Sequence, residues 1–202
     1  MNILIDLVPE SVEIDRTEYK IRTDFRVSIL FEMMMQDEEL SNEEKLLKAL
    51  ELYYPIIPDN VEEAIEKIKW FYRCGKDIVK SNNNNNNNNN KGESVKIYDY
   101  EYDDDYIYSA FLSQYNIDLQ DIRHLHWWKF KAMFKSLNED NKIVKIMQYR
   151  SIDLSEIKDK EQNAYYRKMK KLYEIPRSTG EVEKIRAIED ALMKGESIKH
   201  LL

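Results

Sequence analysis

The stretch that decides the fold runs from His124 to Ser155 and reads HLHWWKFKAMFKSLNEDNKIVKIMQYRSIDLS. It begins with two adjacent tryptophans, and aromatic side chains then recur at helical spacing between lysines. A second apolar segment follows and ends at residues 149–154, YRSIDL. Amphipathic helices have this pattern, so we expect helices over residues 126–137 and 140–149.

The composition of the chain favours helices over a turn-rich β architecture. Its 202 residues include four Gly and four Pro, whereas average usage is about 7% and about 5%. Apolar residues make up 43%, enough for a core, and the 34% of charged residues suits helices with solvated outer faces. We therefore predict a mainly α protein, in which a small N-terminal β-hairpin is followed by helical lobes.

The hairpin and a first helix are expected near the N-terminus. Apolar and polar residues alternate at 12–15 and 19–22 around a turn at 16–18. Thr23 or Asp24 is then placed to cap a helix. The buried face of this helix is expected to hold Phe25, Ile29, Leu30, Met33 and Met34.

Two further helices are expected before residue 80. Ser41 and Glu44 form a capping-box pattern that opens a helix over 43–53. Asp59 and Asn60 open the next helix, whose first turn is rich in Glu. The expected buried residues are Leu46, Leu47 and Leu50 in the first of these helices and Val61, Ile65, Ile68, Phe71 and Tyr72 in the second.

An uninterrupted asparagine tract, Asn82–Asn90, divides the chain. Asparagine is a poor helix former and has nothing to bury, so the tract predicts a flexible linker over 81–97. The linker separates an N-terminal lobe at 1–80 from a helical lobe at 98–176, and a helical tail follows at 177–202. In the second lobe we expect a strand or a simply extended stretch at 98–102, a helix after three consecutive aspartates, and a helix over 155–173.

Charge is distributed unevenly along the chain, whose net charge is −7. Residues 1–90 carry 11 Lys/Arg against 18 Asp/Glu, whereas residues 123–171 carry 13 against 6. An acidic front and a basic middle can steer partners, and they can equally hold two halves of one molecule together. A basic cluster at 167–171 is most simply explained as the solvent-exposed face of a helix.

The sequence gives no support for catalysis, for a metal or for a cofactor. His124 and His126 stand two apart and would point to different faces of a helix. The acidic run at 99–105 lacks the glycine and glutamate that a calcium loop needs, and no glycine-rich phosphate loop occurs. Cys74 has no matched His–acid pair, so we expect an inert thiol. No signal peptide and no apolar run long enough for a membrane span are seen, and we expect an intracellular protein.

The aromatic residues Trp127, Trp128, Phe130 and Phe134 alternate with lysines, which has two interpretations. Aromatic side chains beside lysines could stack on single-stranded nucleic acid. At helical spacing, however, the rings share one stripe while the lysines point elsewhere, which favours packing in a core or at a protein interface. Nucleic-acid binding is the weaker of the two interpretations.

Three segments of the chain resemble one protein family. They are PESV at 9–12 with TDFR at 23–26, YNIDL at 115–119 with LHWWKF at 125–130, and KIM at 145–147 with YRSIDL at 149–154. In this order and spacing they resemble the tail assembly chaperones of long-tailed phages and prophages of Gram-positive bacteria. The resemblance extends from residue 9 to Pro176, and the asparagine tract departs from it.

The resemblance implies a mostly helical protein without enzymatic activity, made in the cytoplasm of the host bacterium. Such chaperones coat the tape measure protein, help to recruit tail tube subunits and leave before the particle is finished. It identifies no binding residues, so the pattern alone suggests the residues that contact the partner. These are the methionines Met33 and Met34, with Met35 beside them, and the aromatic residues Trp127, Trp128, Phe130 and Phe134.

Two alternatives stay open at this point. A structural phage component, such as a tail connector or head-completion protein, would have the same helical character. A small nucleic-acid-binding regulator would use the basic segment at 123–171. Self-association of the chain is compatible with each of these functions, and none of them requires a membrane.

Overall fold

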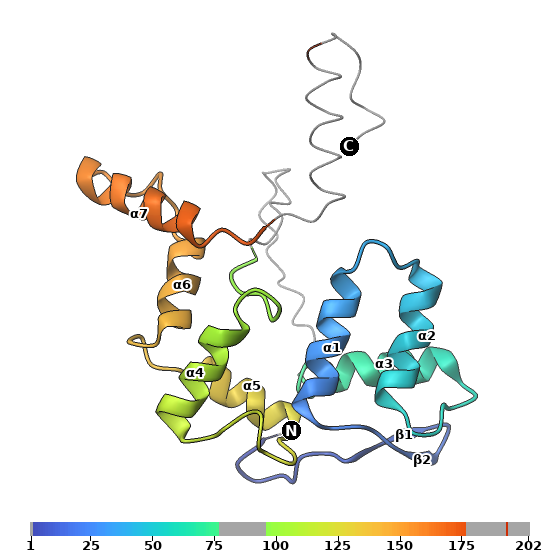
Figure 1. Ribbon diagram of the computed structural model, residues 1–202. Coiled ribbons are helices and arrows are strands. Elements are labelled where there is room, and N and C mark those ends of the chain that lie inside the picture. Colours follow the sequence, from blue (N-terminus) through green and yellow to red (C-terminus); the bar gives the residue numbers. More distant parts are fainter. Residues whose placement is uncertain (1, 77–95, 177–192, 194–202) are drawn as a thin grey trace, which may run out of the picture.

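The computed structural model describes residues 2–76, 96–176 and 193 of the chain, and within them it is mainly α with one small hairpin, as predicted (Figure 1). No helix in these described residues is both long and apolar enough to cross a bilayer. The elements are β1 (Ser11–Ile14), β2 (Thr17–Lys20), α1 (Phe25–Gln36), α2 (Asn42–Tyr53), α3 (Val61–Tyr72), α4 (Asp104–Tyr115), α5 (Trp127–Lys135), α6 (Lys142–Ser151) and α7 (Lys160–Leu172).

The hairpin is confirmed, but its turn is shorter than predicted. β1 and β2 pair antiparallel, and Ile14 lies opposite Thr17. The turn consists of Asp15 and Arg16, whose φ angles are 48° and 62°. Two-residue turns with positive φ at both positions match the right-handed twist of the strands, so Thr17 and Glu18 continue the ladder. The expectation that residues 16–18 form the turn was wrong for this reason.

The predicted starts of the first three helices are confirmed by their caps. Asp24 accepts a hydrogen bond from the Arg26 amide at the start of α1. Ser41 and Glu44 form both bonds of the capping box of α2, and Asn60 caps α3.

The expected buried faces of α1 and α2 were partly wrong. Leu30, Leu46 and Leu47 are 52%, 43% and 53% exposed. The helices pack instead through Ser28 and Tyr53, whose hydroxyl groups lie 2.8 Å apart. The small Ser28 side chain lets the tyrosine ring enter the interface, and the leucines turn outward.

Helices α4, α5 and α6 form the second lobe, and α7 extends from it (Figure 1). Asn116 ends α4 with a φ of 53°, a left-handed conformation that asparagine tolerates. Two starts differ from expectation, because α6 begins at Lys142 and α7 at Lys160. Asp159 caps α7, and this cap sets a later start than residue 155. Residues 98–102, for which a strand or an extended stretch was expected, form neither a strand nor a helix.

The two lobes share one core. The segment before α1 pairs with the segment before α5: the Trp127 amide donates to the Thr23 carbonyl at 2.8 Å, and the Phe25 amide donates to the Leu125 carbonyl at 2.9 Å. Phe25 also stacks on Phe130 with ring centroids 4.8 Å apart. The lobes are therefore packed together at one end, although the exact boundaries at 80 and 98 stay a prediction. The linker expected at 81–97, with its asparagine tract, and the tail expected at 177–202 lie outside the described residues, apart from residues 96–97 and 193.

Candidate partner-binding groove

The aromatic side chains of α5 lie in the core of the protein. Trp127 and Phe130 are 0% exposed, Trp128 is 3% and Phe134 is 5% exposed. The indole N–H of Trp127 donates to the Tyr72 carbonyl at 2.9 Å, and that of Trp128 donates to the Phe71 carbonyl at 2.7 Å. The four aromatic rings are thus packed within the chain, and both indole N–H groups have hydrogen-bond partners there. The partner contacts suggested for these four residues have no exposed ring surface to act through.

The helical pattern predicted that Lys131 lies on the solvent-exposed face of α5. Its side chain instead points inward. Its ammonium group lies 4.9 Å from the Trp127 ring centroid and 5.8 Å from those of Tyr72 and Tyr98. Burial is the main reason why the pKa of Lys131 is lowered, and the nearby Glu32 carboxylate opposes this shift. The stacking surface that nucleic acid would need is therefore occupied by contacts within the chain.

Away from the shared core, an open groove with a volume of about 2030 Å³ lies between the two lobes. One side comes from α1, α2 and the loop between them, and the other from α6, α7 and the segment that follows α7. Met33 and Met34 line this groove, and both are half-buried. The further apolar lining residues are Leu30, Leu40, Leu52, Leu154, Ile175 and Pro176.

The two sides of the groove carry opposite charge. We call the first the acidic wall; its exposed carboxylates are Asp37, Glu38, Glu39 and Glu51. The second, the basic wall, presents Arg167, Lys170 and Lys171. Each wall also holds one residue of the other sign, Lys48 on the acidic wall and Glu174 on the basic wall, so the opposition is one of net charge. Among the described residues no ion pair joins the two walls. The charge asymmetry of the sequence therefore appears in three dimensions as two facing surfaces.

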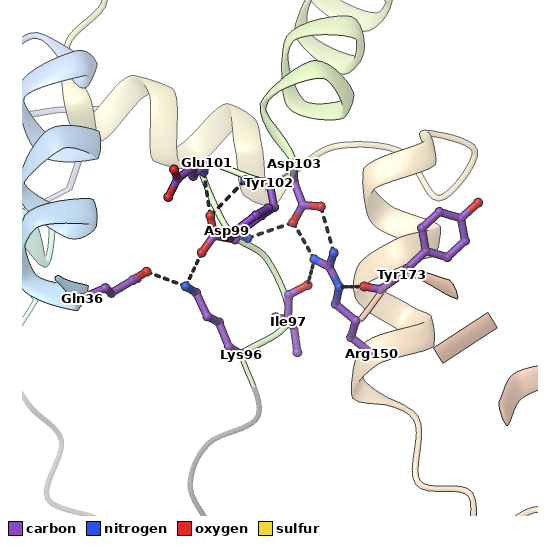
Figure 2. Close-up of polar contacts among 9 residues, drawn as sticks. All are labelled: Gln36, Lys96, Ile97, Asp99, Glu101, Tyr102, Asp103, Arg150 and Tyr173. Carbon is purple, nitrogen blue, oxygen red and sulfur yellow. Dashed lines mark hydrogen bonds and ion pairs between the residues drawn. The ribbon is translucent and has the colours of Figure 1, made fainter. Parts of the chain in front are cut away.

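A polar network crosses the inner end of the groove (Figure 2). Lys96 donates to Gln36 of α1 and to Asp99, and Asp99 also accepts from the Glu101 amide at 2.6 Å and the Tyr102 amide at 3.1 Å. Burial favours a raised pKa for Asp99, but the hydrogen bonds from Lys96 and from the two amides outweigh it and lower the pKa. Asp99 is therefore held in its charged form, and it ties the start of the second lobe to α1 through Lys96.

Arg150 holds the other side of this network. Its guanidinium group forms an ion pair with Asp103, with Nη2 to Oδ1 at 2.9 Å, and both side chains are buried. The same group donates to the Ile97 carbonyl at 3.1 Å and to the Tyr173 carbonyl at 2.6 Å (Figure 2). One planar side chain therefore fixes α6, the start of α4 and the segment after α7. The sequence showed Arg150 within the YRSIDL segment but did not indicate this role.

Cys74 is half-buried and packs against the core. Burial is the main cause that raises the pKa of its thiol, and nearby lysines oppose this shift. Its sulfur lies 3.9 Å from the Tyr72 carbonyl. A raised thiol pKa favours the protonated form, which is the less nucleophilic one.

The fold and the groove define a mainly helical, two-lobed protein with an open amphipathic groove. The chain belongs to the bacteriophage Gp15 protein family, whose model matches residues 4–175. The search of curated proteins and the search of solved structures found no match. Family membership agrees with the phage origin that the sequence resemblance implied.

Proposed function

We propose that this protein is a tail assembly chaperone that binds the phage tape measure protein and helps to recruit tail tube subunits, without catalysing a reaction. The family supports a phage structural or assembly protein. The groove is the observation that supports a chaperone in particular, because half-buried methionines and charged walls lie together at an open surface.

The groove suits a long helical partner. A tape measure protein is a long, largely helical chain, and its apolar stripes would aggregate without cover. Methionine side chains are flexible and polarisable, so Met33 and Met34 can adapt to successive segments of such a partner. An apolar surface with charged rims also suits binding that must be reversed when the tail is completed.

Co-expression with the tape measure protein of the same phage tests this proposal. The wild-type chain is expected to co-purify with it and to raise its soluble fraction. Met34→Glu should abolish both effects, because a carboxylate at the groove surface opposes apolar contact. Met35→Glu is the matched control, because Met35 lies on the same helix, is 48% exposed and does not line the groove. If the wild-type chain leaves the tape measure protein insoluble and does not co-purify, the proposal is wrong.

A structural tail or connector protein is the second candidate, and family membership alone supports it equally. The location of the protein separates the two functions, because a chaperone leaves the particle and a connector stays in it. Detection in purified virions at a fixed copy number would favour the connector. The nucleic-acid-binding alternative would use the basic segment at 123–171. The aromatic side chains of that segment, which could have stacked on bases, lie in the core and give it no support.

A further inference from the structure

We infer that the groove binds an amphipathic helix whose two flanks carry opposite charges, basic toward the acidic wall and acidic toward the basic wall. The inference rests on the proposed function, since it describes the segment of the partner that the groove accepts. It assigns a charge pattern to that segment, which the apolar lining alone would not do.

Each wall of the groove carries charged groups that form no ion pair among the described residues. Asp37, Glu38 and Glu39 lie on the loop that follows α1, and none of their carboxylates takes part in an ion pair among the described residues. On the opposite wall Arg167 and Lys171 are exposed and equally without an ion pair there. Charges that face one another across an open groove favour a ligand that offers the opposite sign to each.

Contacts at the inner end of the groove hold its two walls in place. Lys96 with Gln36 and Arg150 with Asp103 fix the segments from which the walls extend (Figure 2). The shared core fixes the lobes below them. Because no ion pair among the described residues joins the two walls, their charges remain available to a partner that lies between them.

A geometric consequence follows from the two signs. If a helix keeps its apolar face on the methionines and is reversed end to end, its two flanks exchange sides. A helix with segregated charges would then meet like charge on both walls. The groove therefore sets the direction in which such a segment binds, and it discriminates by repulsion as well as by attraction.

Two synthetic helical peptides of about 18 residues, roughly 27 Å long, test the inference. Both have the same composition and the same apolar stripe. One carries Lys along one flank and Glu along the other, and the second mixes Lys and Glu on both flanks. We expect the segregated peptide to bind the full chain at least tenfold more tightly in fluorescence anisotropy at low salt. The difference should shrink at high salt.

The variant Glu38→Lys/Glu39→Lys should remove most of the preference for the segregated peptide. Glu139→Lys/Glu156→Lys is the matched control, because both glutamates are exposed loop residues outside the groove and the net charge changes equally. Circular dichroism of both variants checks that the fold is kept. Equal affinity for the two peptides, or binding of neither, overturns the inference. The chaperone proposal is judged separately by co-purification of the tape measure protein, which can succeed when the peptides fail.

Discussion

Trp127 shows how one side chain joins the two lobes. It stacks on Tyr72 at the end of α3 with ring centroids 5.5 Å apart, and on Phe130 of its own helix at 5.7 Å. Its indole N–H also donates to the Tyr72 carbonyl. A buried tryptophan with a satisfied N–H contributes a large contact area at no cost in unpaired polar groups.

Trp127→Ala is therefore expected to destabilise the protein by about 3–5 kcal/mol, because a large cavity would open in the shared core. Urea unfolding followed by circular dichroism measures the effect. Ile56→Ala, at a position that is 76% exposed, is the control and should change stability little. A small effect of Trp127→Ala would show that the side chain does not lie in the core.

The buried ion pair between Arg150 and Asp103 leads to a second prediction at the residue scale. Arg150→Met would leave the Asp103 carboxylate buried without its partner, at a cost of about 3–5 kcal/mol. The double variant Arg150→Met/Asp103→Asn should recover part of this loss, since the unpaired charge is gone while an amide oxygen remains to accept from the Asp99 amide. Lys145→Met, which breaks the exposed pair with Asp140, serves as the control in the same urea titrations. If the double variant is less stable than Arg150→Met, the ion pair is not the cause.

The N-terminus of α5 depends on a neutral imidazole. His126 Nδ1 accepts a hydrogen bond from the Trp128 amide at 3.1 Å, and Nε2 lies 3.0 Å from the Pro9 carbonyl. This arrangement requires Nε2 to carry the proton. Burial is the main cause that lowers the pKa of His126 below 6.5, and the Pro9 carbonyl opposes the shift. A proton on Nδ1 would also place positive charge at the positive end of the helix dipole.

A pH dependence follows from this lowered pKa. Between the folded pKa and the unfolded value near 6.5, the unfolded chain binds more protons. The contribution of His126 to stability is thus complete above that value and is lost as the pH falls through the folded pKa. We expect the free energy of unfolding of the wild type to fall more steeply than that of His126→Asn between about pH 7.5 and about pH 5.5. His124→Asn is the control, and parallel curves for wild type and His126→Asn would contradict the assignment.

The ends of helices were more predictable from sequence than their faces. Asp24, Ser41 and Asn60 carry their capping signal within a few residues, so local pattern found them. Leu46 and Leu47 were expected inside because α2 taken alone has no reason to turn them out. Which face is buried depends on the neighbouring helices, here through Ser28 and Tyr53, and that information is not local.

The site was predictable only in part for the same reason. Met33 and Met34 were chosen by their chemistry and do line the groove. The aromatic stripe of α5 had the same apolar chemistry and lies in the core, because Phe25 of α1, Tyr72 of α3 and Phe111 of α4 pack against it. The pairing of Arg150 with Asp103 joins residues far apart in sequence, and no spacing rule predicts it.

The shared core predicts that both lobes unfold together. Trp70, Trp127 and Trp128 lie where α3 meets α5, and Trp70 and Trp128 pack edge to face at 5.4 Å. Tryptophan fluorescence therefore reports on the interface, whereas circular dichroism reports on all helices. The two signals are expected to give one coincident urea transition. Two separated transitions would show that the lobes are independent domains.

Amide hydrogen exchange on the complex with the tape measure protein tests the central claim most directly. If the partner lies in the groove, exchange should slow at residues 30–40 and 167–176, which form its two walls, while β1 and β2 exchange as in the free chain. A stable complex whose protected amides lie elsewhere, with both walls exchanging as before, would contradict it.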